Sequence, residues 1–252
     1  MEPILKVENL TKVFARKGQP DFAAVNHIGF ELMPGECLGI IGESGSGKTT
    51  VVNMVTRLTD PTEGRIVLDG QDITRLSGKA LRGPYQKMQM VFQTPTESFD
   101  PRRKLGDGIG ESLRNSGMGK AETKRRVAEL LEQCGLPADF ADRYPHQVSG
   151  GQCQRAAIAR AIAIGPKLLI CDEATSALDV TIQKEVLALL QRLRQELDLS
   201  ILFICHDIAL VQQFCDRVLV LYKGGIVEEG IPDDVIRNPQ NDYTKRLIES
   251  IL

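Results

Sequence analysis

The stretch from Cys37 to Leu58 constrains the fold of this chain more than any other. Cys37 to Ile41 is a short apolar run typical of a buried strand, and apolar residues recur at helical spacing from Lys48 onward. The residues between them fit the pattern GxxxxGK[ST] in its strand–loop–helix context and are Gly42-Glu43-Ser44-Gly45-Ser46-Gly47-Lys48-Thr49. This order predicts a phosphate-binding loop at the end of a strand.

Each residue type in this loop has a chemical reason to be there. Glycines let backbone N–H groups curl around phosphate oxygens, and the start of the following helix adds unpaired donors and a positive dipole end. Lys48 can then reach the β and γ phosphates, and the Thr49 hydroxyl can bind Mg²⁺. The alternative is a glycine-rich turn followed by a chance Lys-Thr pair.

A second element ends in two carboxylates. Leu168 to Cys171 is an apolar strand followed by Asp172 and Glu173, and an open α/β sheet places ligand-binding groups at such strand ends. Asp172 is expected to hold Mg²⁺, and Glu173 to act as general base on the attacking water. Alone, the pair would suggest a solvated helix cap, but the phosphate loop favours the catalytic interpretation.

A third element is a helix start rich in glycine. Val148 precedes Ser149-Gly150-Gly151-Gln152, in which Ser149 is a good N-cap and the two glycines leave the backbone bare. This suggests a second phosphate-binding helix end, although an ordinary cap would look the same.

The remaining pattern predicts the sheet around these motifs. Strands alternate with helices from residue 152 onward, which indicates a mainly parallel sheet covered on both faces. Arg65 to Leu68 with the turn Asp69-Gly70 indicates an antiparallel appendage. Gly106 to Pro145 is charged and helical, with Ala121 to Cys134 as an amphipathic helix. No internal repeat is present, so one such unit is expected.

Composition excludes several classes of protein. The 252 residues include 31 Lys and Arg against 33 Asp and Glu. The net charge of −2 therefore gives no overall positive potential that would attract nucleic acid. There is neither a leader-like N-terminus nor a run of 18 apolar residues, so we expect neither secretion nor a membrane span. Six cysteines lack metal-ligand spacing and are expected to be buried small hydrophobes.

The order of the motifs resembles the ABC ATPase family over the whole chain. Val148 to Gln152 resembles the signature motif of the family, with Val148 in place of the usual leucine. After this signature and the Asp-Glu strand come Ser176-Ala177-Leu178-Asp179 and a later His206. The resemblance implies an α/β fold: a P-loop NTPase domain of ABC type with a mainly parallel sheet core, an antiparallel β subdomain and a helical subdomain. One domain is expected over 1–252, with 1–92 and 166–252 as RecA-like core and antiparallel part, and about 93–165 as Q-loop and helical subdomain.

The resemblance also implies roles for single residues. ATP with Mg²⁺ would lie between the loop of one subunit and the signature of another, so one chain is half an enzyme. Gln93 would sense Mg²⁺ and water and link to a membrane subunit, and His206 would position the water, although an isolated histidine is more often structural. The expected set is catalytic Lys48, Gln93, Glu173 and His206; metal-binding Thr49, Gln93 and Asp172; ATP-binding Phe14, Gly42, Glu43, Ser44, Gly45, Ser46, Gly47, Lys48, Thr49 and Thr50; and, toward the partner's nucleotide, Ser149, Gly150, Gly151, Gln152 and Asp179.

Phe14 lies where the family places an aromatic ring against adenine. A ring face can stack on a base without distinguishing its identity sharply. Because the register of a strand is not fixed by its sequence, Phe14 could equally be a core residue.

Further segments are similar to the peptide/nickel import branch of the family, in particular its second ATPase subunit. They are Gln93-Thr94-Pro95, Ser98 to Arg102, Arg143 to Gln147 and Tyr243-Thr244-Lys245, with departures at Asp100 and Asn241-Asp242. The branch implies ATP-driven uptake of peptides, nickel or a metal chelate. The implied partners are a paralogous ATPase (or a second copy), two transmembrane permeases and an extracytoplasmic binding protein, with the chain peripheral on the cytoplasmic face of the membrane.

Three other functions fit the sequence less well. A mechanical ABC ATPase of DNA repair or translation usually carries a coiled-coil insertion or two tandem units, and neither is visible in the sequence. A P-loop kinase needs an acceptor site and a lid, and leaves Val148 to Gln152 unexplained. A non-enzymatic nucleotide-binding module is disfavoured because Glu173 and His206 are both present.

Overall fold

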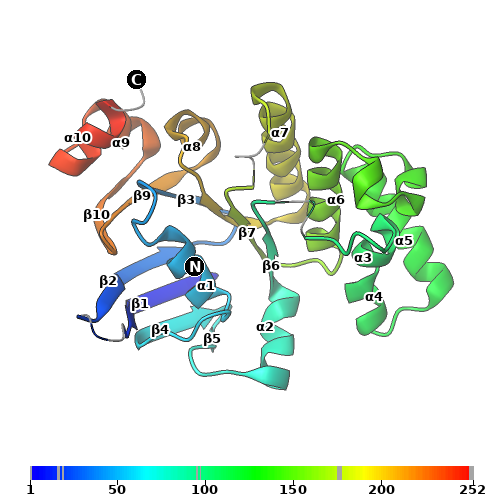
Figure 1. Cartoon of the computed structure of the whole chain (residues 1–252), viewed down its shortest axis with the longest axis horizontal. Helices are drawn as coiled ribbons and strands as arrows, with labels where there is room; N and C mark the ends of the chain where they lie inside the picture. The colour runs from blue at the N-terminus through cyan, green and yellow to red at the C-terminus, as the bar shows by residue number, and fades with distance from the viewer. Residues whose placement is uncertain are drawn as a thin grey trace.

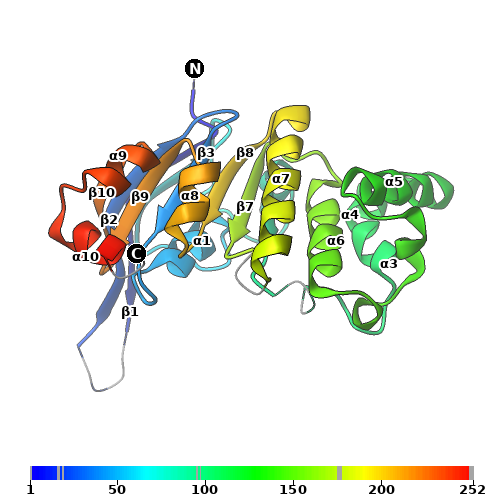
Figure 2. The same cartoon turned by 90° about the horizontal axis from the view of Figure 1, so that it is seen from above.

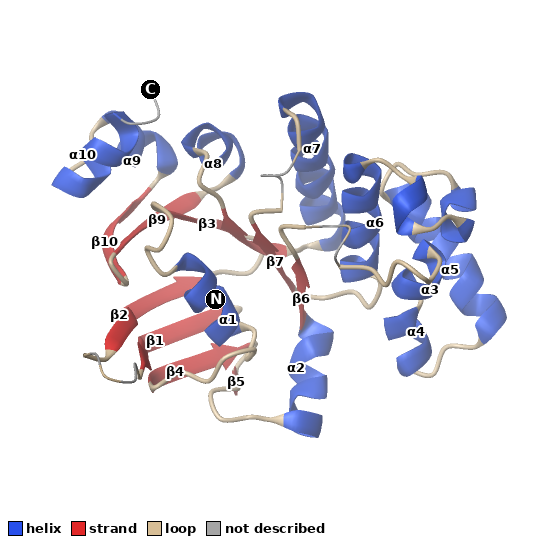
Figure 3. Cartoon of the chain, viewed as in Figure 1, coloured by secondary structure: helices blue, strands red, loops and turns tan. Residues whose placement is uncertain are grey.

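The computed structural model describes residues 2–15, 18, 20–94, 96, 98–174 and 178–249, which form two sheets surrounded by helices (Figures 1 and 3). The strands are β1 (Leu5–Phe14), β2 (Phe22–Leu32), β3 (Cys37–Ile41), β4 (Glu63–Leu68), β5 (Gln71–Asp72), β6 (Met88–Val91), β7 (Leu168–Asp172), β8 (Ser200–Ile204), β9 (Arg217–Tyr222) and β10 (Gly225–Gly230). The α-helices are α1 (Lys48–Val55), α2 (Arg82–Lys87), α3 (Leu105–Ile109), α4 (Glu111–Asn115), α5 (Lys120–Gln133), α6 (Gly150–Ile162), α7 (Val180–Leu197), α8 (Ile208–Phe214), α9 (Pro232–Arg237) and α10 (Asp242–Glu249). Short 3₁₀ helices are η1 (Gly78–Leu81), η2 (Ala138–Asp142) and η3 (Pro145–Gln147).

The larger sheet has six strands in the order β10-β9-β3-β8-β7-β6. Strands β9, β3, β8, β7 and β6 run parallel, and β10 returns antiparallel beside β9. All five residues of β8 are buried, as expected for a central strand covered on both faces. The predicted mainly parallel sheet is confirmed.

Alternate residues of the larger sheet enter two different cores. Leu202 and Ile204 belong to the cluster that contains α1 and the antiparallel sheet, so α1 lies between the two sheets (Figure 3). Ile201 and Phe203 belong to the cluster of α6, α7 and α8 on the opposite face. Phe203 makes an edge contact with Phe214 of α8, with ring centroids 5.0 Å apart.

The smaller sheet is antiparallel in the order β2-β1-β4-β5. The turn between β4 and β5 has Asp69 at φ 48° and Gly70 at φ 75°, which is the left-handed pair of a tight hairpin. The predicted antiparallel appendage is therefore confirmed. Its long β1–β2 hairpin projects from one end of the molecule in Figure 2.

Helices α3 to α6 gather at the opposite side of the molecule from β10 (Figures 1 and 2). In α5 the predicted stripe of Val127, Leu130 and Leu131, with Cys134 just beyond it, is buried. The hydrophobic cluster of this region continues without a break into the face of the larger sheet. The division of the chain at about residues 93 and 165 remains a prediction.

Two predicted ends are wrong. The helix after the glycine-rich loop was expected to reach Leu58 but ends at Val55, because Arg57 takes a left-handed conformation with φ 60° and leaves Leu58 61% exposed. The apolar run Met88 to Phe92 predicts a strand of that length, but strand β6 ends at Val91, and Phe92 is 42% exposed.

The cysteines behave as predicted. All six are free and buried, and burial raises the pKa of the Cys153 and Cys205 thiols to about 11. Within the described ranges, no helix has both the length and the apolar character required to traverse a bilayer.

Candidate nucleotide site

The predicted site residues of the larger sheet meet at one edge because their strands are parallel neighbours. Strands β3, β8, β7 and β6 are adjacent in that order. Ile40, Ile204 and Asp172 are register partners, so the segments that follow these strands emerge side by side. The phosphate loop, His206, the Asp-Glu pair and Gln93 follow β3, β8, β7 and β6 in turn.

The loop needs glycine at two positions for steric reasons. Gly42 and Gly47 have φ of 150° and 112°, outside the usual range of other residues. A Cβ at Gly42 would lie 2.2 Å from the Leu221 carbonyl oxygen, and one at Gly47 would lie 2.5 Å from that of Ala24. The loop therefore lies directly against the backbone of β2 and β9.

Lys48 is folded back over the loop. Its Nζ donates hydrogen bonds to the carbonyl oxygens of Gly42 at 2.7 Å and Glu43 at 2.9 Å. The residue is 6% exposed, and burial lowers its pKa, while the carboxylates of Glu173 and Asp172 act in the opposite direction. A buried cation on a glycine loop, with exposed Ser44 and Thr49 beside it, fits the phosphates of ATP.

The carboxylate pair occupies the end of β7. Burial, and then the neighbouring Glu173, raises the pKa of Asp172, while Lys48 opposes the rise. Both the partly buried position beside the loop and the oxygen chemistry suit a Mg²⁺ ligand. The loop and the carboxylates together therefore fit Mg²⁺–ATP.

Glu173 sits in a left-handed conformation with φ 47°, which is uncommon outside glycine. Its backbone N–H donates to the Ile204 carbonyl oxygen at 3.0 Å, which continues the sheet pairing beyond β7. Gln93 Nε2 donates to Glu173 Oε2 at 2.9 Å. The structure thus brings the predicted base and the predicted Q-loop residue into direct contact.

His206 is exposed at the end of β8. The next residue, Asp207, caps α8 by accepting hydrogen bonds from the N–H groups of Ala209 at 2.8 Å and Leu210 at 3.2 Å. His206 is therefore held between a buried strand and a capped helix, on the same edge as the other predicted groups.

The signature begins α6 with a reciprocal capping box. The Ser149 hydroxyl accepts from the Gln152 N–H at 3.3 Å, and Gln152 Oε1 accepts from the Ser149 N–H at 2.9 Å. Gly150 is exposed, but Gly151 is buried, and a Cβ there would lie 2.5 Å from Ile182 Cγ2 of α7. Helix α7 therefore packs against Gly151 on the side where a Cβ would project, and the contact of this glycine with a partner's nucleotide remains a prediction.

The signature is carried by a different part of the chain from the phosphate loop. Helix α6 packs on α3, α5, α7 and the edge strand β6, whereas α1 packs on β2 and β7. Val148 packs against the larger core, which supports the expectation that this replacement keeps the packing. Asp179 caps α7 by accepting from the Ile182 N–H at 3.0 Å, while Ser176 and Ala177 lie outside the described residues.

Phe14 is not a core residue. It is 41% exposed at the end of β1, opposite Phe22 of β2, and Lys12 Nζ lies 5.0 Å from its ring centroid. The core alternative is therefore excluded, and the adenine-stacking role remains a prediction.

The phosphate loop also has supports that the sequence analysis missed. The Gly224 N–H donates to the Ser46 carbonyl oxygen at 2.8 Å, and the Glu43 N–H donates to the Tyr243 hydroxyl at 2.9 Å. In the sequence, Tyr243 stands out only through its similarity to the importer branch. No local pattern indicates a contact with a loop so far away in the chain.

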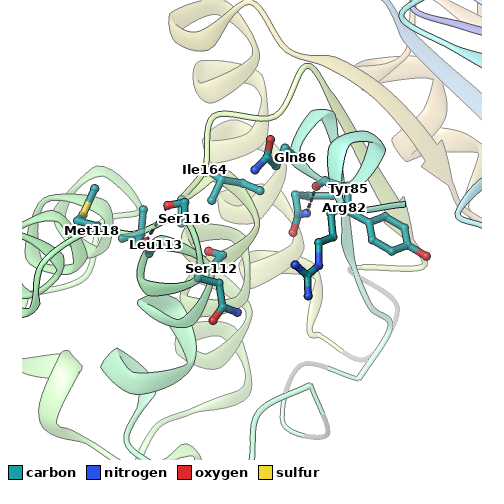
Figure 4. A pocket seen from close by; sticks show the side chains of 11 residues that line it. Arg82, Tyr85, Gln86, Ser112, Leu113, Ser116, Met118 and Ile164 are labelled. Atoms are coloured by element: carbon teal, nitrogen blue, oxygen red, sulfur yellow. Dashed lines mark hydrogen bonds between the residues drawn. The ribbon is translucent and has the colours of Figure 1, made fainter. Parts of the chain in front are cut away.

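A cavity of about 720 Å³ lies away from the phosphate loop, between α2, α4 and the end of α6 (Figure 4). Arg82, Tyr85 and Gln86 form one wall, and Ser112, Leu113 and Ser116 form another. Gln89 of β6, four positions before Gln93, also lines it.

A parallel sheet with a glycine-rich phosphate loop after one strand and an Asp-Glu pair after a nearby strand defines a P-loop nucleoside triphosphatase. The family model of ABC transporters matches residues 25–176. The chain belongs to the ABC transporter family, and its chemistry is ATP hydrolysis with Mg²⁺.

Similar proteins extend this result. A protein of Brucella ovis, provisionally named a peptide import ATP-binding protein, is 43% identical over 250 residues, which are 99% of this chain and 78% of the relative. The glutathione import ATP-binding protein GsiA of Salmonella choleraesuis is 44% identical over 257 residues, covering 99% of this chain and 41% of the relative.

Solved structures show the same fold. The ATP-binding cassette MJ0796, in a dimeric post-hydrolysis state bound to ADP and phosphate, has a TM-score of 0.82 and 31% identity, covering 90% of this chain and 98% of that one. CbiO1 from Clostridium perfringens, part of the ABC transporter complex CbiONQ, has a TM-score of 0.84 and 30% identity, covering 94% and 92%.

Proposed function

We propose that this chain is the ATPase subunit of an importer for peptides, nickel or a related metal chelate. It pairs with a paralogous ATPase and works beneath two permease subunits fed by an extracytoplasmic binding protein. In this role it is a peripheral subunit on the cytoplasmic side of the membrane. The relatives named as peptide and glutathione import proteins support import and give no support to a mechanical module without membrane partners.

One observation carries the requirement for a second ATPase subunit. Ser149 and Gly150 are exposed at the start of α6, which packs with α3, α5, α7 and β6. A helix start with an exposed glycine lets another molecule approach the backbone closely, which suits an anion brought by that molecule. Two chains facing head to tail would each complete the other's site, and the dimeric MJ0796 structure supports such pairing.

The residues of this chain then have separate tasks. The loop and Lys48 bind the phosphates, while Asp172 and Thr49 hold Mg²⁺, which supplies charge neutralisation on the phosphate oxygens when bound. Glu173 takes a proton from the attacking water, and Gln93, which donates to Glu173 Oε2 at 2.9 Å, orients that carboxylate. His206 assists at the γ phosphate from the adjacent strand end.

Closure of the dimer links hydrolysis to transport. Moving an open–closed equilibrium from 1:99 to 99:1 takes about 5.5 kcal/mol of differential binding. Contacts made equally in both states add nothing to this shift. Only groups that reach the nucleotide on closure supply it, and the signature residues Ser149, Gly151 and Gln152, together with Asp179, are the groups assigned to that contact.

The cavity of Figure 4 offers a surface for a permease segment. Its walls come from α2 on the sheet side and from α4 on the helical side, and Gln89 connects it through β6 to Gln93. A permease segment bound there would touch both the sheet side and the helical side of the chain, whose relative positions change when the dimer closes. Ser116 is exposed at its rim, so Ser116→Trp should abolish stimulation of the ATPase by the permeases and leave basal hydrolysis unchanged.

The central experiment replaces the proposed base in the assembled complex. Glu173→Gln keeps the size of the side chain and its ability to form hydrogen bonds but removes its basicity. We expect ATP to bind normally, turnover to fall by more than about 100-fold, and an ATP-dependent ATPase dimer to accumulate in size-exclusion chromatography. Gln191→Ala, on the exposed surface of α7 far from Asp179, is the control. ATP binding without any association in the complete system would reject the proposal.

A further inference from the structure

Tyr243 of α10 contacts the phosphate loop from the far end of the chain. Its hydroxyl accepts the Glu43 backbone N–H at 2.9 Å, across 200 positions of sequence. Tyr243 is 4% exposed, and its ring stacks on that of Tyr222 with centroids 3.9 Å apart. Burial raises the pKa of Tyr243, so the hydroxyl stays protonated and neutral near neutral pH.

The hydrogen bond acts on the peptide that anchors Lys48. The Glu43 N–H and the Gly42 carbonyl belong to one planar peptide unit. That carbonyl accepts a hydrogen bond from Lys48 Nζ at 2.7 Å. Tyr243 and Lys48 therefore hold opposite edges of the same peptide, and rotation of the peptide would break both contacts.

The peptide needs an external restraint because glycine supplies little of its own. Gly42 has φ 150°, a region open to glycine, and glycine has the widest choice of backbone conformations. On the other side of the loop, the Gly224 N–H donates to the Ser46 carbonyl oxygen at 2.8 Å. The loop is thus held at its middle by the β9–β10 turn and at its start by Tyr243.

Helix α10 is itself fixed where Tyr243 enters it. The Glu228 carboxylate accepts the backbone N–H groups of Gln240 at 2.8 Å and Asn241 at 3.0 Å. Asn241 Oδ1 accepts the Tyr243 N–H at 2.8 Å, which gives this departure from the importer pattern a role at the start of the helix. Leu247 is buried one turn further on. The start of α10, which carries Tyr243, is therefore fixed to β10 by hydrogen bonds.

We propose that Tyr243 is a positioning residue for phosphate binding. Its hydroxyl fixes the Gly42–Glu43 peptide and, through it, the Lys48 ammonium group in the orientation that receives the phosphate chain of the nucleotide. Helix α10 is in this way part of the nucleotide site. The inference rests on the proposed role of the loop.

The test measures ligand affinity of the full chain by displacement of a fluorescent ATP analogue. Tyr243→Phe keeps the ring stack and removes only the hydroxyl. We expect the Kd of both ATP and inorganic tripolyphosphate to rise about five- to tenfold, where tenfold equals about 1.4 kcal/mol, the size of one hydrogen bond. Tyr222→Phe removes a hydroxyl from the other ring of the stack and should change neither Kd by more than about twofold.

A second measurement separates positioning from general stability. In a Lys48→Ala background the side chain held by this peptide is gone, so Tyr243→Phe should alter the Kd of tripolyphosphate by less than about twofold. A purely structural role would instead lower the unfolding midpoint and leave every Kd at its parent value, and that outcome overturns the inference. An equal loss in Tyr222→Phe also overturns it. Failure of the unsubstituted chain to bind ATP would refute the proposed site itself.

Discussion

Replacing Gly151 by alanine tests the close packing of the signature helix on α7. The new Cβ would lie 2.5 Å from Ile182 Cγ2, and an ordinary contact begins at 3.4 Å, so about 0.9 Å of movement is required. Forcing a methyl group into a packed interface costs about 1–3 kcal/mol. The higher helix propensity of alanine relative to glycine offsets up to about 1 kcal/mol of this cost. The expected net destabilisation is about 1 kcal/mol, or a fall in the unfolding midpoint of about 2–4 °C.

The assay is thermal and urea unfolding of the parent and four variants. Gly150→Ala is the matched control, since its Cβ would lie 3.7 Å from Leu178 Cδ2, an ordinary contact. Ile182→Ala removes the clashing methyl group. The loss of unfolding free energy in the Gly151→Ala/Ile182→Ala double variant should therefore be at least about 0.5 kcal/mol smaller than the sum of the losses in the two single variants. Additive effects, or a midpoint raised by Gly151→Ala alone, would show that α7 does not constrain this glycine.

Three further changes have expected outcomes. Phe14→Ala should weaken ATP binding about fivefold, because stacking on one base is worth about 1 kcal/mol or more, and should leave tripolyphosphate affinity unchanged; equal losses for both ligands would remove Phe14 from the adenine site. Asp172→Asn should abolish Mg²⁺-dependent ATP binding yet raise the unfolding midpoint of the nucleotide-free chain at pH 7. Burial raises the pKa of Asp172, so its negative charge opposes folding at neutral pH, and this cost disappears as the pH falls through the folded pKa; a lowered midpoint at pH 7 would contradict the argument. Hydrogen bonds from Thr74 lower the pKa of Asp72 from 3.8 to about 2, so its carboxylate adds stability that is present above pH 3.8 and lost as the pH falls toward 2. In urea titrations the advantage of the parent over Asp72→Asn should be constant above about pH 4 and shrink below it, and a difference independent of pH would show that ionisation is not its source.

The sequence alone determined the elements whose geometry is local. A glycine pattern between a strand and a helix, Ser149 before a helix, and two carboxylates after an apolar strand each involve a few consecutive residues. Backbone conformation and capping favour such local structures within a few consecutive residues. The strands, the parallel sheet and the position of the phosphate loop were accordingly predictable.

Only the tertiary structure decided which of these pieces meet. The order β3-β8-β7-β6 brings Gln93 to Glu173, the packing of α7 buries Gly151, and α10 carries Tyr243 to the loop across 200 positions. The exposure of Phe14 likewise depended on the register of β1 against β2. These contacts join segments far apart in the chain, and their energies depend on how whole faces of sheets and helices fit together, which no short window of sequence contains.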